Sequence, residues 1–360
     1  MEVSNELFVQ SLRAGLWGDT PIADIDETVA RDIWTEARKQ SCRGVVGQVL
    51  LDSGILPPKA KKIVSDRIVS IIGHNLALSR VLSISVKALR DKGIEPVLLK
   101  GQGAASSYPQ PLLRECGDID LYVGTEHYRE AFDVLSGLTG EIDEEGFSTE
   151  GKHSHVVIDG MTVETHRFSE VLPPGYDKQY QELSDMGMSS GGEVLDIGGT
   201  DVRIPEPTFN AFYLFNHLWR HFFTEGVGFR QVCDWTMFLH ARKDRIDKDR
   251  LGHILKTLDL TAPWKVFGNI AVGVLGLPAD EMPFYSQEYL DKSRKIVRMM
   301  LKEGNFGHER REWYALDRNS VFGLSKVMAS ITGRYLGLYP VFGRVILVEY
   351  IDRIRRRLSR

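Results

Sequence analysis

Two aspartates that are two positions apart, Asp118 and Asp120, are the residues best suited to chemistry in this sequence. Acidic and apolar residues alternate around them, which predicts a β-strand over residues 119–123. Side chains two apart on a strand point to the same face, so the two carboxylates lie on one face, about 7 Å apart at Cα. Mg²⁺ is bound by a few carboxylates together with water and phosphate oxygens. A pair of this kind can therefore hold the metal ions of a phosphoryl-transfer site.

A glycine-containing strand end precedes the aspartates. Residues 96–99 are a short apolar run bounded by proline and Gly101, which predicts a buried strand. The backbone at Gly101 and Gly103 has no side chain in the way of a phosphate, and Lys100 adds a positive charge. Arg114 is either only a surface charge or, four residues before Asp118, placed to contact a phosphate or to pair with an acid. Each feature alone is common in proteins, but their closeness in the sequence makes a metal and phosphate site a more specific prediction.

A hairpin is predicted further along the chain. Residues 153–158 and 161–166 flank Asp159-Gly160, a dipeptide typical of a two-residue turn. Glu164 and His166 share a face of the second strand, because strand side chains alternate. The same alternation is also explained by an exposed hairpin face that has no part in catalysis.

Histidines form two further groups. His153 and His155 share one face of the first hairpin strand, and His166 is expected opposite them. Zinc binding with metal-dependent hydrolysis is one interpretation of this group, and structural or substrate-contacting histidines are the preferred one. His217 and His221 have the spacing of a helical metal pair, but the residues between them lack the glutamate of a zinc protease.

The periodicity of apolar residues divides the chain into three parts, and the predicted fold class is α+β. Residues 1–92 are expected to form an N-terminal helical region that ends at residues 91–93. Residues 93–204 are expected to form a mixed α/β core, and residues 205–360 a C-terminal helical region. No flexible linker separates the parts, so they are expected to pack together.

The composition is that of a globular protein. The 360 residues are 42% hydrophobic and 26% charged, with a formal net charge of -4, which excludes the disordered and collagen-like classes. The 45 Lys and Arg residues are balanced by 49 Asp and Glu residues. There is no overall basic field, so long nucleic acid is not expected as a partner.

Compartment and membrane contact are predicted from local features. Cys42, Cys116 and Cys233 are isolated, which excludes a disulfide scaffold or zinc ribbon, and residues 1–6 are acidic where a secretory signal is basic. A cytoplasmic protein without a transmembrane helix is predicted, since no long uncharged apolar run occurs. Residues 353–360 contain five arginines and no acid. A solvated helix end is the first interpretation, and weak peripheral contact with a membrane is the second.

Together the motifs resemble the polymerase-β-like nucleotidyltransferases, in particular the bacterial group usually labelled uncharacterised nucleotidyltransferases. That group shows an apolar strand ending in Lys-Gly, a Tyr-Pro, an arginine, and then Gly-Asp-φ-Asp-φ, where φ is apolar. The corresponding elements here are residues 97–101, Tyr108-Pro109, Arg114 and residues 117–123. The likeness extends from residues 12–18 to residues 303–307, which is most of the chain.

The resemblance implies a polymerase-β-like mixed sheet between two helical parts. Asp118 and Asp120 hold Mg²⁺, or Mn²⁺ in its place, against a nucleoside triphosphate such as ATP. Glu164 is the third carboxylate, from a later strand, and it helps to deprotonate the acceptor that attacks the α-phosphorus. The residues expected to face the phosphates are Lys100, Gly101, Gly103 and Arg114.

The resemblance also gives the C-terminal helical part a role. Several polar residues lie in this otherwise apolar region, in a pattern similar to that of the family: Asn216, His217, His221, Arg230 and Asp234. His221, Arg230 and Asp234 are therefore expected near the nucleotide or acceptor, with His166 as a further substrate contact. A buried hydrogen-bonded network between two helices is the alternative.

The implied function is Mg²⁺-dependent transfer of a nucleoside monophosphate to an unidentified acceptor, either a small molecule or a protein. Gly101 lies seventeen residues before Asp118, farther than the glycine pair of the wider superfamily. One explanation of this distance is a loop insertion at residues 108–111 that preserves the site. The other is that nucleotide binding is altered or lost. The alternative function is therefore a catalytically inactive nucleotide-binding or partner-binding protein that retains the fold.

Overall fold

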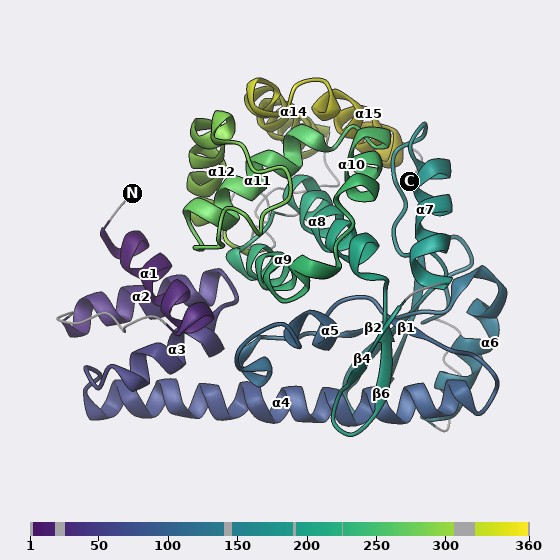
Figure 1. Cartoon of the computed structure of the whole chain (residues 1–360), viewed down its shortest axis with the longest axis horizontal. Helices are drawn as coiled ribbons and strands as arrows, with labels where there is room; N and C mark the ends of the chain where they lie inside the picture. The colour runs from purple at the N-terminus through teal and green to yellow at the C-terminus, as the bar shows by residue number, and fades with distance from the viewer. Residues whose placement is uncertain are drawn as a thin grey trace.

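A small mixed sheet lies between an N-terminal and a larger C-terminal group of helices, and one long helix runs along the sheet and the N-terminal group (Figure 1). This computed structural model describes residues 3–18, 26–139, 146–189, 192–224, 226–305 and 321–358. The strands of these ranges all lie between residues 97 and 204. The α+β class predicted from the sequence is confirmed.

The N-terminal group begins with short helices whose ends are set by local chemistry. Its members are α1 (Val3–Trp17), α2 (Glu27–Lys39), α3 (Arg43–Asp52) and α4 (Pro58–Arg90). Asp26 caps α2, because its Oδ1 accepts a hydrogen bond from the backbone N–H of Val29 at 2.8 Å. The last of these helices ends just before residues 91–93, as predicted.

Helix α4 is amphipathic. Its buried residues recur at spacings of mostly three and four, from Val64 to Leu89, and the helix contacts α3, β4 (Met161–His166) and α6 (Gly124–Gly137). By length and composition alone α4 could cross a membrane: the mean hydropathy of its most apolar 18-residue stretch is 1.4, and 39% of that stretch is buried. The sequence criterion, an uncharged run, did not select it. In this structure the helix joins the N-terminal group to the sheet.

The sheet has the strand order β3-β4-β2-β1-β6-β5. Its strands are β1 (Val97–Leu98), β2 (Ile119–Tyr122), β3 (His153–Ile158), β4 (Met161–His166), β5 (Glu193–Asp196) and β6 (Asp201–Ile204). β2 lies parallel to β4 and β1 lies parallel to β6, whereas the other neighbouring pairs are antiparallel. The predicted hairpin of β3 and β4 is confirmed. Asp159 and Gly160 have φ of 48° and 76°, because this tight turn requires positive φ at both residues.

The remaining elements surround the sheet. Within the α/β part they are α5 (Gln102–Ala105), η1 (Pro111–Leu113), α6 (Gly124–Gly137) and α7 (Asp177–Ser189). In the C-terminal part they are α8 (Pro207–Thr224), α9 (Phe229–Arg242), η3 (Lys243–Arg245), α10 (Lys248–Thr257), α11 (Thr261–Gly273), η4 (Gln287–Tyr289), α12 (Leu290–Glu303), α14 (Val321–Phe342) and α15 (Val345–Leu358). Sequence periodicity did not resolve α7, β5 or β6.

Helix α15 carries the start of the arginine-rich segment. Its acid Glu349 is buried and paired with Arg220 of α8, whereas Leu347 and Ile351 are 43% and 64% exposed. The side chains from residue 356 onward lie outside the described part of the chain, so contact of this segment with a membrane stays a prediction. Phe306 and Gly307, at the far end of the family resemblance, also lie outside it.

A hydrophobic core connects the helical groups with the sheet. Phe8 of α1, Leu98 of β1 and Trp219 of α8 belong to the same buried cluster, and none of their surface is exposed. Edge-on aromatic contacts join the C-terminal helices, for example Trp235 against Trp264 with ring centroids 4.7 Å apart. The helices that cover the sheet are therefore fixed by packing.

Close packing of α3 on η1 gives a stability prediction. A Cβ placed on Gly44 would lie 1.9 Å from the carbonyl oxygen of Leu113, and two backbone segments would have to separate. We expect Gly44→Ala to lower the free energy of unfolding by about 2–3 kcal/mol. Urea unfolding monitored by far-UV circular dichroism would measure the change.

Gly73→Ala is the matched control. Gly73 lies on the exposed side of α4, and a Cβ there meets nothing within 4 Å. Alanine is the better helix former, so this variant should be as stable as the wild type or up to about 1 kcal/mol more stable. Equal stability of the two variants would contradict the close contact at Gly44.

Candidate active site

The pairing of two parallel strands brings the acidic residues together. Asp120 of β2 is the register partner of Glu164 of β4, so the two carboxylates leave the same face of the sheet side by side. One ligand atom from each of Asp118, Asp120 and Glu164 lies within 4.8 Å of the others. On the opposite face Ile119 and Val163 are fully buried in the core. The core side of each strand thus fixes the position of the carboxylates.

Lys100 lies beside both aspartates. Its Nζ lies 3.1 Å from Asp120 Oδ1 and 4.0 Å from Asp118 Oδ2. Burial by itself favours the neutral amine, but the charges of Asp120, Asp118 and Glu164 outweigh it and raise the pKa of Lys100. Lys100 is therefore charged at neutral pH, directly beside the proposed metal ligands.

The two glycines after Lys100 have different surroundings. Gly101 lines the site, has φ of 59°, and a Cβ there would lie 3.3 Å from the carbonyl oxygen of Asp118. A side chain is disfavoured at this φ, so glycine is required where the strand turns. Gly103 lies inside α5, where a Cβ would meet the side chains of Ile204 and Leu98. The structure therefore places Gly101 at the cavity and Gly103 in the packing behind it.

His166 lies between two of the carboxylates. Its Nε2 is 3.0 Å from Asp120 Oδ1 and 3.1 Å from Glu164 Oε2, and the side chain is 2% exposed. Burial opposes a charged imidazole, but the hydrogen bonds to Asp120 and Glu164 raise the pKa of His166. His166, predicted as a substrate contact, is thus hydrogen-bonded to two carboxylates of the acidic cluster.

The carboxylates themselves are held in the ionised form. Burial raises the pKa of Glu164, but the hydrogen bond and charge of His166 and the charges of His153 and Lys100 outweigh it, giving a pKa of about 2. For Asp120, the positive charge of Lys100 and the His166 hydrogen bond likewise overcome burial and lower the pKa. Asp120 Oδ2 is buried without a hydrogen-bond partner. An ionised set with an unused buried oxygen suits a divalent cation.

A cavity of about 660 Å³ opens above this cluster, between the sheet and helices α8 and α9. The sequence-predicted residues that line it are Lys100, Gly101, Arg114, Asp118, Glu164, His166, His221, Arg230 and Asp234. Asp120 lies beneath them and is 1% exposed. Residues from three distant stretches of the sequence therefore meet at one cavity of the size that small ligands occupy.

Arg114 and Asp234 form a buried ion pair at the cavity wall. Arg114 Nε donates to Asp234 Oδ1 at 3.0 Å and Nη2 donates to Oδ2, while the Tyr108 hydroxyl donates to Oδ1 at 2.7 Å. Arg114 Nη1 also donates to the carbonyl oxygen of Glu115. Arg114 therefore pairs with an acid, which is one of the roles predicted for it. Asp234 belongs to the buried hydrogen-bonded network that was predicted as the alternative to a substrate contact.

The helical wall adds further nitrogen-bearing groups. The rings of His217 and His221 lie 4.4 Å apart, edge to face, and burial holds the pKa of His217 well below its usual value. Within the described ranges these two histidines belong to no group of three metal ligands, so a helical zinc site is not supported. Arg230 Nη1 donates to the carbonyl oxygen of Glu115 at 2.8 Å, which orients its guanidinium at the cavity.

The comparison with protein families identifies the chain. A family model described as uncharacterised nucleotidyltransferase matches residues 26–271, more than half of the sequence. The chain belongs to this family. The matched range includes every residue that lines the cavity and ends within α11. The comparisons with curated proteins and with solved structures find no match.

Sequence reasoning missed several residues that line the cavity. Lys152, Tyr213 and Gln231 line the cavity, and Lys152 Nζ is 3.2 Å from Glu170 Oε2. No spacing distinguishes Lys152 from other lysines, because its partner follows in an irregular segment after β4. Gln231 could have been found from its place beside Arg230. These residues extend the polar wall beyond the predicted set.

The buried ion pair gives a prediction that separates structure from substrate contact. Asp234→Ala would leave the charged Arg114, 6% exposed, without its partner, so we expect a loss of about 3–5 kcal/mol in the free energy of unfolding. The double variant Arg114→Met, Asp234→Leu should lose less than Asp234→Ala, because neither charge is then stranded. Chemical unfolding of the three proteins checks this; a single variant as stable as the wild type would refute it.

The Lys152–Glu170 pair gives a pH prediction. Burial raises the pKa of Glu170, but the charges of Lys152 and Arg220 outweigh it, and the pKa falls from 4.5 to about 2. Ionised Glu170 therefore stabilises the fold above pH 4.5, and this contribution disappears as the pH falls toward 2. Glu170→Gln should cost on the order of 3 kcal/mol at neutral pH and little at low pH.

Urea unfolding of wild type and Glu170→Gln at a series of pH values measures this difference. Glu182→Gln is the control, because Glu182 is exposed on α7. A stability difference for Glu170→Gln that stays constant down to pH 3 would be inconsistent with a depressed pKa.

Proposed function

We propose that this member of the family transfers a nucleoside monophosphate from a nucleoside triphosphate to an acceptor, with Mg²⁺ held by Asp118, Asp120 and Glu164. The parallel register of Asp120 with Glu164 is the observation that carries the proposal. It gathers three carboxylate groups at the mouth of one cavity. The unpartnered Oδ2 of Asp120 fits a cation there. The mixed sheet and the order of the motifs support placement among the polymerase-β-like nucleotidyltransferases.

The residues around the cluster are arranged for a highly charged substrate. Divalent metal bound by the carboxylates would neutralise charge on the phosphate oxygens as the acceptor attacks the α-phosphorus and pyrophosphate leaves. Lys100 supplies a fixed positive charge at the same point. Arg230 and Lys152 bring further cationic groups to the cavity walls. The backbone turn at Gly101 leaves room for a phosphate to approach.

Glu164 acts as a metal ligand in this proposal. A carboxylate whose pKa is about 2 binds cations well but accepts a proton poorly at neutral pH. The role of base, which the family resemblance assigned to Glu164, is therefore a weak one. The proton of the acceptor has to leave by another group or to solvent.

The acceptor is proposed to be a small molecule. A cavity of about 660 Å³ lies in the range of sites that enclose cofactors and small ligands. Because α8 and α9 cover the sheet on that side, the acceptor has to share this space with the triphosphate. An inactive protein that only binds nucleotide is the alternative, and the intact set of three carboxylates favours the active enzyme.

The test is loss of metal-dependent chemistry in the double variant Asp118→Asn, Asp120→Asn. In the wild type, one of the four nucleoside triphosphates should raise the melting temperature only with Mg²⁺ present, and pyrophosphate release with an acceptor mixture should follow. In the variant the Mg²⁺-dependent shift should vanish, and release should fall by at least about 100-fold.

Asp66→Asn, on the exposed side of α4, serves as the matched control and should behave as the wild type. Undiminished turnover in the double variant would rule the assignment out. A Mg²⁺-dependent shift in the wild type without pyrophosphate release from any acceptor mixture would instead favour the inactive nucleotide-binding protein.

A further inference from the structure

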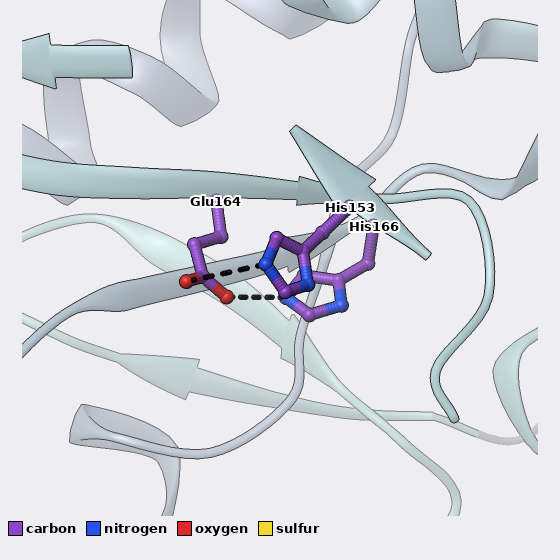
Figure 2. Close-up of side chains that lie close together, drawn as sticks. All are labelled: His153, Glu164 and His166. Atoms are coloured by element: carbon purple, nitrogen blue, oxygen red, sulfur yellow. Dashed lines mark hydrogen bonds and ion pairs between the residues drawn. The ribbon is translucent and has the colours of Figure 1, made fainter. Parts of the chain in front are cut away.

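Glu164 belongs to a second group of potential metal ligands. His153 Nε2 lies 3.6 Å from its Oε1, and His166 Nε2 lies 3.1 Å from its Oε2, so each carboxylate oxygen faces one imidazole (Figure 2). One ligand atom from each of the three residues lies within 4.8 Å of the others. The three side chains converge on one side of the hairpin formed by β3 and β4.

The hairpin register creates this group. His153 of β3 is opposite His166 of β4, and paired residues of antiparallel strands project to the same face. Glu164 lies two positions from His166 on that face, within reach of both rings. The turn at Asp159 and Gly160 fixes the register, since a slip of one residue would send the histidines to the other face.

The separations match those between ligands of one metal ion. With metal–nitrogen and metal–oxygen bonds of about 2.1 Å, neighbouring ligand atoms of a tetrahedral site are about 3.4 Å apart. The two contacts of Glu164, 3.1 and 3.6 Å, lie on either side of that value. The 3.6 Å separation is also too long for a direct hydrogen bond. The His153 side chain is 33% exposed, so its ring has room to turn toward a metal ion bound beside Glu164.

The donor atoms determine which ion fits. Imidazole nitrogen favours Zn²⁺, Co²⁺ and related transition-metal ions, whereas sites made of carboxylates and water favour Mg²⁺. The group of Asp118, Asp120 and Glu164 is made of oxygen alone, and the group of His153, Glu164 and His166 supplies two nitrogens. The two groups share Glu164, so one carboxylate can bridge neighbouring cations, as in two-metal phosphoryl-transfer sites.

We propose that His153, Glu164 and His166 form a second cation position in this site, selective for a transition-metal ion over Mg²⁺. It deepens the proposed function, and it rests on that function for the role of the neighbouring carboxylates. In the alternative, His166 only holds Asp120 and Glu164 in place by hydrogen bonds, and His153 binds no metal. The two readings differ in whether His153 contributes to metal affinity.

The test uses Co²⁺ alone, added to the metal-free full-length protein. The wild type should bind Co²⁺ with visible d–d absorption bands that report nitrogen ligation, and excess Mg²⁺ should not abolish these bands. His153→Ala should weaken Co²⁺ binding by at least about tenfold. His155→Ala is the matched control on the same strand, because His155 belongs to neither ligand group within the described residues, and it should bind Co²⁺ as the wild type does.

Two further variants keep the outcome independent of the transferase assay. Asp118→Asn should retain Co²⁺ binding at the histidine position even though it disables the oxygen-only group, whereas Glu164→Gln should lose it. Thermal unfolding of each metal-free variant shows whether the fold is intact, and His153→Gln replaces the alanine variant if that one is unstable. Equal Co²⁺ affinity in His153→Ala and the wild type would overturn the proposal, as would a Co²⁺ spectrum without nitrogen ligation. Absence of pyrophosphate release would bear on the proposed function and leave this measurement unaffected.

Discussion

The parallel pairing of β2 with β4 is the constraint on which the rest of the site depends. It places Asp120 directly beside Glu164, and two carboxylates this close repel each other strongly where water is scarce. This repulsion is offset by Lys100 on one side and by His166, which lies between the two carboxylates. The charge of Lys100 and the hydrogen bonds of His166 thus keep the two carboxylates ionised. A divalent cation bound here would take over the neutralisation of the carboxylates that Lys100 now supplies.

The polar wall opposite the sheet depends on contacts from the N-terminal helices. Gln40 accepts a hydrogen bond at its side-chain oxygen from the backbone N–H of Phe229, at the start of α9. Glu115 accepts from the backbone N–H of Arg43 at 2.7 Å, and its carbonyl oxygen receives Arg230. The position of Arg230 at the cavity is therefore set by residues that are distant in sequence and make no contact with the carboxylates. This explains why the helical groups and the sheet share one core.

The sequence predictions that the structure confirms depend on local features of the sequence. The alternation around Asp118 and Asp120, and the Asp159-Gly160 turn, depend on neighbours within a few residues, and the strands they predict are present. The pairing of Arg114 with Asp234 spans 120 positions, and that of Lys152 with Glu170 crosses an irregular segment, so no period reveals either. β5 and β6 were not predicted because each has only four residues, and no residue of β5 is buried. Gly103 was grouped with Gly101 by sequence closeness, although a helix begins between them.

Helix α4 has a mechanical consequence. Its 33 residues form a rod about 50 Å long, which contacts α3 near one end and α6 and β4 farther along (Figure 1). The helix is continuous, with no loop between its two ends, so it sets the distance between the N-terminal helices and the sheet. Asp120 and Glu164 are therefore carried on a frame that extends along this rod to the N-terminal helices, well beyond the cavity itself.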